Sequence, residues 1–518
     1  MSSLPSRIAS LIHNHFDALP ARSKPNIFPD GSREWIPMTG IVIVKGENTP
    51  TERLHCIAIT TGAKCLAASH MPRCQGLVLH DCHAEILAIR AFNHWLLTEC
   101  HGLLSEERRL LGSDQPPEPG QGSSATSPFI RRRVNKNQEH PLIPSAKWPP
   151  FEMQPDIQIY MYCTCAPCGD ASMELCMAAQ EDATPWEVRQ ANPSPASPGN
   201  PFAQDIMLDG RANFSLLGVV RRKPARTDAE STRSKSCSDK LALRQVSSLL
   251  SCETSHLIAP TENVYLAGLV LPENEISRIG CERSFGENGR MAALKGSSWS
   301  SSTVDGEVRY RFRPFQVLAV PSREIEAMWQ FAKPKSVDTS STLQSKPGDI
   351  TDSSTLTGTP RKSKPGTSSA IWTAAPSFAH CFAPPSETGS KTLPTLRRSK
   401  TGIYETIING LKQGTKVSSP SARGASSLSR AKLWAFLRDI VEANSTDLVS
   451  CLYEDWSRGL TTYEGFKRAR DDSAGHVQAR AQAIQDTKEV LGGWIPNPGD
   501  EGWGLNVLVA EPKKRKRG

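Results

Sequence analysis

The sequence predicts an α/β fold in which helices flank a mixed sheet, followed by a C-terminal half that is mostly helical. Short apolar runs typical of buried strands occur at 41–44 and 264–271. Apolar residues recur at helical spacing over 8–16, and the pattern after residue 426 is again mostly helical. Strands that alternate with helices in this way indicate one α/β core.

Each element can be justified from its pattern. Ile8, Leu11, Ile12 and Phe16 lie on one face of a helix, which predicts an amphipathic N-terminal helix packed on the core. The runs at 41–44 and 55–59 are rich in β-branched residues and predict two strands. Apolar and polar side chains alternate over 157–162, which predicts a further strand. The continuous apolar run at 264–271 predicts a strand buried on both faces.

Composition divides the chain into parts of one domain and tracts inserted into it. Segments rich in Pro, Gly, Ser and charge cannot bury enough apolar surface to fold, so we expect disordered insertions. The expected N-terminal, central and C-terminal parts of the domain are 1–104, 148–333 and 370–509. The expected insertions are 105–147 and 334–369, and a basic tail occupies 510–518.

Bulk properties limit the class of protein. The formal charge is +8 over 518 residues, which is compatible with a nucleic-acid partner. No stretch approaches the ~20 apolar residues of a membrane span, and the N-terminus lacks the apolar region of a secretory signal. We therefore expect no membrane association. The 14 cysteines should then stay reduced, so their clusters indicate metal ligation before disulfides.

A His-Ala-Glu motif is the first sign of chemistry. His83 and Glu85 stand where a helix is expected to begin. Hydrolytic deamination of a nucleobase needs a metal-activated water and a carboxylate that transfers protons without binding the metal. One imidazole and one nearby carboxylate supply those parts. Two surface residues of a helix would give the same short pattern.

Two cysteine motifs complete a possible metal site. Pro-Cys-Gly-Asp at 167–170 directly follows a predicted strand, where a helix N-terminus favours the thiolate of Cys168. Cytidine-type deaminases place a second cysteine three residues later, but here that residue is Ala171. Ser-Cys-Ser-Asp-Lys at 236–240 offers Cys237 instead. His83, Cys168 and Cys237 would leave the fourth position of a tetrahedral zinc to water.

A different metal site is also conceivable. The cysteines at 163, 165, 168 and 176 are crowded, and a structural zinc or an iron–sulfur cluster could use them. Cys163 and Cys165 share the apolar face of the predicted strand, however, which favours a place in the core. No second Cys-x-x-Cys follows to complete such a site.

The three motifs in this order resemble those of the RNA adenosine deaminase family. The likeness extends to Thr-Gly-Ala-Lys-Cys at 61–65 and His-Asp-Cys-His-Ala-Glu at 80–85. Further similar motifs lie at 412–414, 427–433, 463–467 and 493–494. The resemblance implies a cytidine-deaminase-like core, zinc held by His83, Cys168 and Cys237, and Glu85 as the proton-transferring residue. It also implies that Lys64 contacts the substrate.

The family further implies a buried inositol hexakisphosphate that holds the C-terminal half in place. The matching positions are Arg90, Lys240, Arg430, Tyr463, Lys467, Arg480 and Trp494. A relay from the zinc site to this anion would use Asp81 and Lys240. This chain departs from the family at Ile89, Leu243 and Asn497, where a basic residue is usual, and it has Arg244 where Trp is usual. Any one of the basic residues could instead belong to a solvated surface.

The resemblance favours tRNA as substrate. The catalytic match begins near residue 60, which leaves no room for a separate double-stranded-RNA-binding domain before it, and the Gly-Glu-Gly base-flipping loop of the duplex-editing members has no counterpart. The implied reaction converts adenosine to inosine, at the adenosine 3′ of the anticodon of alanine tRNA. Editing of duplex mRNA and a catalytically retired RNA-binding module are the alternatives.

The basic run at 512–517 has the composition of a nuclear localisation signal, so we expect the protein in the nucleus, the cytoplasm or both. A solvated tail that contacts RNA phosphates is the other interpretation.

Overall fold

The structure is a computed structural model. It describes residues 2–29, 31–111, 125–133, 149–179, 208–210, 216–223, 230–300, 309–334, 364–378, 402–444, 461–468 and 475–509. The basic run at 512–517 therefore lies outside the described residues.

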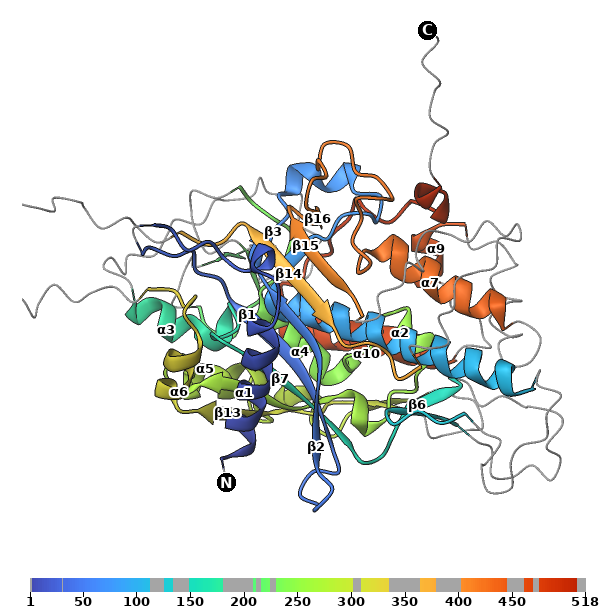
Figure 1. Ribbon diagram of the computed structural model, residues 1–518, viewed down its shortest axis with the longest axis horizontal. Helices are drawn as coiled ribbons and strands as arrows, with labels where there is room; N and C mark the ends of the chain where they lie inside the picture. The colour runs from blue at the N-terminus through green and yellow to red at the C-terminus, as the bar shows by residue number, and fades with distance from the viewer. Residues whose placement is uncertain are drawn as a thin grey trace, which may run out of the picture.

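An eight-stranded mixed sheet forms the centre of the molecule (Figure 1). In order across the sheet, its strands are β13 (Gln316–Val320), β10 (Leu266–Pro272), β7 (Ile157–Cys163), β1 (Met38–Lys45), β2 (Arg53–Thr61), β14 (Ser368–Thr373), β15 (Tyr404–Ile408) and β16 (Leu411–Lys412). Strands β7, β10 and β13 run parallel to one another, and the other neighbouring pairs are antiparallel. The predicted mixed sheet is therefore confirmed.

Each face of the sheet has its own apolar core. On one face, α1 (Leu4–Asp17) buries Ile8, Ile12 and Phe16 against strands β1, β2, β7 and β13. On the other face, the long helix α2 (Ala84–Leu111) packs against β1, β2 and β14. Helix α7 (Arg430–Ala443) packs on α2 and lies beside it in Figure 1, so the C-terminal part thickens this second layer.

The remaining α-helices of the described residues are α3 (Met173–Ala178), α4 (Cys237–Ser247), α5 (Arg278–Phe285), α6 (Ser322–Met328), α9 (Tyr463–Arg468) and α10 (Gly475–Leu491). Four two-stranded pairs complete the described elements: β3 (Ala63–Cys65) with β4 (Asp81–His83), β5 (Ile130–Arg132) with β6 (Phe151–Met153), β8 (Leu208–Asp209) with β9 (Arg221–Arg222), and β11 (Ser298–Ser300) with β12 (Arg309–Arg311).

The predicted N-terminal helix and the four predicted strands are all present, as α1, β1, β2, β7 and β10. One local prediction is wrong. His83 does not lie in the first turn of a helix but ends strand β4, and α2 begins at the next residue. The β3–β4 pair, in which Ala63 lies opposite His83, holds this position in extended backbone.

The edges of the two predicted insertions need correction. Helix α2 extends to Leu111, and β5 covers Ile130–Arg132, so both lie within the 105–147 segment. Residues 364–369 also belong to the fold, because Pro365 forms a bridge with Trp35 and β14 begins at Ser368. What remains of each tract, 112–124 and 134–147 in the first and 335–363 in the second, lies outside the described residues.

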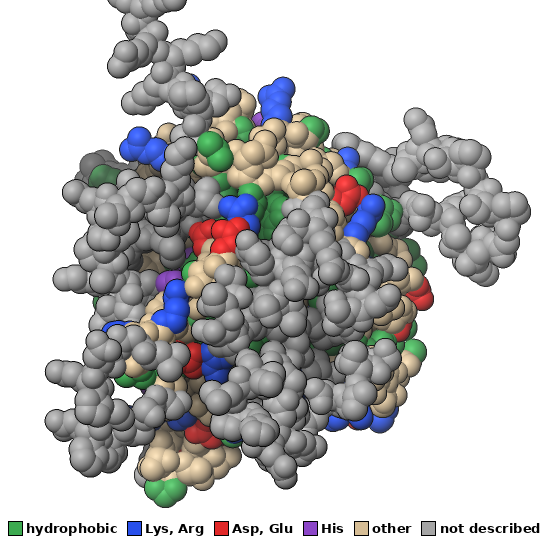
Figure 2. All heavy atoms as spheres, turned by 90° about the vertical axis from the view of Figure 1, so that its right-hand side faces the viewer, with side chains coloured by type: hydrophobic (Ala, Val, Ile, Leu, Met, Phe, Trp, Pro, Cys, Tyr) green, Lys and Arg blue, Asp and Glu red, His purple; other side chains and the backbone are tan. Residues whose placement is uncertain are grey.

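Among the described residues, none of the helices combines the length and apolar character that a membrane span requires. On the face drawn in Figure 2, the Lys and Arg side chains of the described residues lie scattered.

Candidate metal centre and catalytic site

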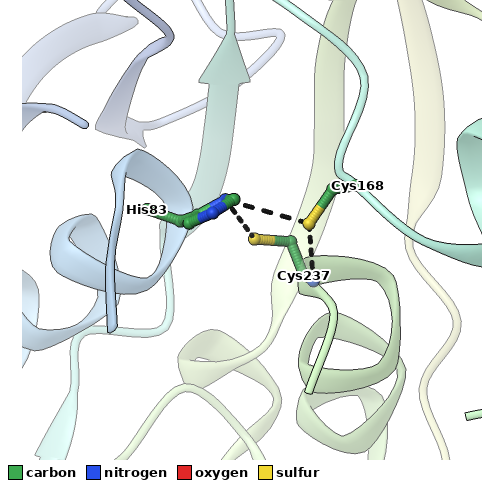
Figure 3. A group of neighbouring side chains, drawn as sticks. All are labelled: His83, Cys168 and Cys237. Atoms are coloured by element: carbon green, nitrogen blue, oxygen red, sulfur yellow. Dashed lines mark hydrogen bonds between the residues drawn. The ribbon is translucent and has the colours of Figure 1, made fainter. Parts of the chain in front are cut away.

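Three side chains from distant parts of the chain point toward one point (Figure 3). His83 ends β4, Cys168 lies in the turn after β7, and Cys237 is the first residue of α4. Nδ1 of His83 is 3.8 Å from Sγ of Cys168 and 3.6 Å from Sγ of Cys237. These three were the predicted metal ligands, and the structure brings them together as a group that could hold a metal ion.

The donor set fits zinc. Zinc–sulfur and zinc–nitrogen bonds of ~2.3 Å and ~2.0 Å at tetrahedral angles separate the donor atoms by roughly 3.5–3.8 Å. The two measured nitrogen–sulfur distances agree with that spacing. Three protein ligands leave one position for water, as in catalytic zinc sites.

Backbone geometry explains why the two cysteine motifs have these sequences. Gly169 has a φ of 105°, and a Cβ there would stand 2.2 Å from Oγ of Ser236, so only glycine fits. Ser236 caps α4 by accepting a hydrogen bond from the Asp239 amide at 3.1 Å. The Ser238 amide donates to the Cys168 carbonyl at 3.0 Å. The turn after β7 is thereby fastened to the first turn of α4.

The charge on the sulfur atoms is set by these contacts. The Cys237 amide, at the N-terminus of α4, donates to Sγ of Cys168 at 3.3 Å. A hydrogen bond from the Cys237 thiol, together with the positive charges of Lys223 and His83, holds the pKa of Cys168 well below its usual range. A cysteine that is readily a thiolate is a competent metal ligand.

Glu85 lies in the first turn of α2 and is buried. Burial raises the pKa of its carboxyl group above the usual value. A raised pKa makes the carboxylate of Glu85 a stronger base, which favours proton transfer beside a metal site. This is the property that the predicted role of Glu85 requires.

Asp81 forms the expected contact with Lys240, and the structure adds a second cation. Lys223 is buried, and its Nζ donates to Oδ2 of Asp81 at 2.9 Å and to Sγ of Cys237 at 3.2 Å. Lys223 therefore connects Asp81 directly to a metal ligand. Sequence reasoning missed it because Lys223 ends a basic run, 221–223, that belongs to no recognisable motif. Its backbone directly follows β9 and is held on both sides: the Lys223 amide donates to the Ser234 carbonyl at 2.8 Å, and the Lys223 carbonyl accepts from the Thr232 hydroxyl at 2.8 Å.

Three of the arginines expected to hold a polyanion are Arg90, Arg430 and Arg480. Arg90 donates to the Leu428 carbonyl at 2.9 Å, and Arg430 donates to the Asp500 carbonyl at 3.1 Å. Burial and the charge of Arg430 lower the pKa of Arg90, which indicates cations crowded together. Nε of Arg480 is buried and has no hydrogen-bond partner among the described residues. Crowded guanidinium groups and an unsatisfied buried donor fit an anionic ligand.

The other predicted residues lie around this group. The Tyr463 hydroxyl donates to Glu253 at 3.0 Å, while Lys467 is 41% exposed and pairs with Glu501. Trp494 is partly buried, packs at the edge of an apolar cluster, and has Lys488 Nζ 5.9 Å from its ring centre. Lys64 is exposed on β3, opposite Cys82 of β4. Lys64 thus lies on the strand that pairs with β4, which carries the metal ligand His83.

The alternative cysteine cluster finds no support within the described part of the chain. Cys163 is buried, and neither it nor Cys165 or Cys176 belongs to a group of donors close enough to share a metal ion. A separate group joins Cys74, His80 and Asp500. There, Asp500 already pairs with His80 at 2.8 Å and lies 3.6 Å from a guanidinium nitrogen of Arg430. The positive charge of Arg430 therefore already balances the carboxylate that a metal ion would bind.

Comparison with known proteins agrees with this site. Residues 58–115 and 130–376, more than half of the chain, match the sequence model described as the adenosine-deaminase (editase) domain. The chain is 34% identical over 318 residues to the tRNA-specific adenosine deaminase 1 of Schizosaccharomyces pombe, covering 61% of this chain and 68% of that protein. It is 31% identical to the protein of the same name from Saccharomyces cerevisiae, covering 52% of this chain and 59% of that one. It is also 32% identical to the double-stranded RNA-specific editase B2 of Rattus norvegicus, over 26% of this chain and 14% of that protein. The chain belongs to the adenosine-deaminase (editase) domain family.

Proposed function

We propose that this protein is a zinc-dependent hydrolase that converts adenosine to inosine in tRNA. The observation that carries the proposal is the convergence of His83, Cys168 and Cys237 beside the buried carboxyl group of Glu85. The reaction consumes one water and releases one ammonia for each inosine. The names of the two yeast relatives support tRNA as the substrate.

The residues around the site have distinct tasks. Bound zinc would supply the Lewis acid that lowers the pKa of a water molecule. Glu85 would accept a proton from that water, deliver it to the purine ring and assist the departure of ammonia. Lys223 and Asp81 would orient Cys237 and balance the negative charge that two thiolates bring to the site.

For the substrate position we propose the adenosine 3′ of the anticodon in alanine tRNA. A base in an anticodon loop is poorly paired, so moving it into an active site costs little free energy. Editing of duplex RNA is the second candidate, favoured by the similarity to the rat editase. That match covers a much smaller share of the relative than the matches to the two yeast proteins do.

The test is inosine formation by the purified protein on alanine tRNA and on a long RNA duplex, read by sequencing, with the metal content measured in the same preparation. We expect about one zinc per chain, inosine in the tRNA, and much slower reaction on the duplex. Cys237→Ala should lose both zinc and turnover. Inosine in the duplex alone would establish the second candidate, and full zinc occupancy in Cys237→Ala would refute the ligand set.

We also propose inositol hexakisphosphate as a structural ligand held by Arg90, Arg430, Arg480 and their neighbours. Support comes from the crowded guanidinium groups and the unsatisfied Nε of Arg480.

Finally, we propose that the basic run at 512–517 directs part of the protein to the nucleus. Fusion of this run to a fluorescent reporter, compared with a copy in which its lysines and arginines are replaced by glutamine, tests that assignment.

A further inference from the structure

Helix α4 carries three functional side chains at helical spacing. Cys237, Lys240 and Arg244 are three and four residues apart, so they follow one another along one side of the helix. The first belongs to the metal group, and the second pairs with Asp81. Arg244 continues this line away from the metal site. Trp is the usual residue of the family motif at this position, so the motif assigns no cation to it.

Arg244 meets Arg480 at a single carbonyl group. Nη1 of Arg244 donates to the Leu250 carbonyl at 2.8 Å, and Nη2 of Arg480 donates to the same oxygen at 3.0 Å. Helix α10, which carries Arg480, packs against α4. Two guanidinium groups are thus held side by side although their like charges repel.

The local charges do not balance. Burial, together with the positive charges of Arg480 and Arg90, lowers the pKa of Arg244 to about 9. Glu253 is the carboxylate whose charge opposes this effect on Arg244. The described hydrogen bonds of Arg244 are made by Nη1, and the buried Nε of Arg480 has no hydrogen-bond partner among the described residues. An anionic ligand would offset the repulsion between these partly buried cations and accept a hydrogen bond from the unsatisfied Nε of Arg480.

We propose that Arg244 binds the inositol hexakisphosphate directly, as the side chain that joins α4 to the ligand shell formed with Arg480 and Arg90. This inference rests on the proposed ligand and adds a residue to it. Arg244 would thereby supply the cation that Leu243 lacks, from the adjacent position of the same helix. One helix would then contact both the metal, through Cys237, and the polyanion, through Arg244.

The experiment measures the ligand and not only the activity. The full chain is purified from cells that make inositol hexakisphosphate, and the bound inositol phosphate is quantified by mass spectrometry after denaturation. Exchange of the bound ligand with an excess of isotopically labelled inositol hexakisphosphate is then followed over time.

Three variants are compared with the unaltered protein: Arg244→Gln, Arg244→Lys and the control Arg438→Gln. Gln retains a donor for the Leu250 carbonyl but removes the charge, and Lys retains the charge. Arg438 is a partly exposed arginine of α7 that pairs with Glu442.

We expect one ligand per chain in the unaltered protein, and exchange at least about tenfold faster in Arg244→Gln, because a charge-assisted hydrogen bond is lost. Arg244→Lys should exchange at an intermediate rate, and Arg438→Gln should match the unaltered protein. Equal exchange rates in the unaltered protein and Arg244→Gln would overturn the role of Arg244 while leaving the ligand in place. If Arg244→Gln yields no soluble protein, an exchange rate of Arg244→Lys equal to that of the unaltered protein overturns it. An unaltered protein without any inositol phosphate would refute the ligand itself.

Discussion

Glu85 and Glu99 are two buried carboxyl groups of the same helix, and only Glu85 lies beside the metal group. We predict that Glu85→Gln keeps zinc and the fold but lowers turnover on tRNA by about 10²–10⁴-fold, because the amide cannot transfer the proton. Glu99→Gln is the matched control and should leave turnover unchanged. Rates of inosine formation and zinc content of both variants check this. Near-normal turnover in Glu85→Gln would remove Glu85 from the mechanism.

Glu99 gives a separate prediction about stability. Its carboxylate accepts hydrogen bonds from the Ser127 hydroxyl and the Ser377 amide, yet burial raises its pKa from 4.5 to about 7. The folded protein therefore holds this proton more tightly than the unfolded chain does. The contribution of Glu99 is most favourable below pH 4.5 and is lost as the pH rises to about 7.

Replacement of Glu99 by glutamine removes this pH dependence. Relative to the unaltered protein, Glu99→Gln should gain about 3 kcal/mol in free energy of unfolding between pH 4.5 and pH 8, provided the amide keeps the same hydrogen bonds. Urea unfolding at a series of pH values measures the difference. A difference between the two proteins that does not change with pH would show that the pKa of Glu99 is the same in the folded and the unfolded protein.

The ligand set could be predicted from sequence because each ligand stands in a motif whose chemistry demands it. Lys223 could not, since burial and position alone give it a role, and neither can be read from the basic run 221–223. We predict that Lys223→Met lowers the free energy of unfolding by about 3 kcal/mol, because Asp81 stays buried with one of its two cations gone. Arg131→Met, which removes a half-exposed ion pair with Glu152, should cost less than about 1 kcal/mol. Equal losses of unfolding free energy in the two variants would mean that the buried ion pair of Lys223 stabilises the fold no more than a half-exposed one does.

At the scale of elements, β14 marks where the second insertion truly ends. Composition placed the boundary at residue 369, but Ser and Thr also occur in strands, so composition alone cannot separate a polar tract from the first residues of a strand. Two hydrogen bonds locate the base of the tract. The Trp35 amide donates to the Lys364 carbonyl and the Ile36 amide donates to the Phe331 carbonyl, each at 3.0 Å. The chain therefore leaves and returns at neighbouring residues of one segment.

Because the two ends lie side by side, residues 335–363 should be replaceable by a short Gly/Ser linker. We expect the free energy of unfolding and the turnover to change little, since closing a shorter loop lowers the entropic cost of folding. The contrasting deletion of 364–373 removes β14 from between β2 and β15 and should abolish folding. Circular dichroism and turnover of both deletions decide the matter. A first deletion that fails to fold would make 335–363 part of the core.

At the scale of the whole molecule, the sequence predicted the centre of the sheet better than its edges. Strands β1, β2, β7 and β10 have long apolar runs because helices cover both faces there. The outer strand β13 was not predicted although residues 317–320 form a short apolar run, and β16 has two residues, which is too short for a pattern of its own. The position of each motif on the sheet depends on the order of the strands, and a local sequence pattern does not reveal that order. Even so, the order of the three metal motifs along the chain was enough to predict that they meet.

Whether the fold depends on the proposed anion is also a question about the whole molecule. Arg90 belongs to α2, Arg244 to α4, Arg430 to α7 and Arg480 to α10, so their guanidinium groups belong to four different helices of the molecule. Without a polyanion these like charges would repel one another in a partly buried space, and the helices that carry them could not pack as they do. We predict that protein expressed in cells unable to make inositol hexakisphosphate is insoluble or unfolded, and that restoring the cells' synthesis of the compound restores soluble protein. Solubility, circular dichroism and mass spectrometry of the bound ligand from both cell types measure this. A folded and active protein from the deficient cells, together with no inositol phosphate in the normal preparation, would show that the arginines are balanced by the protein alone.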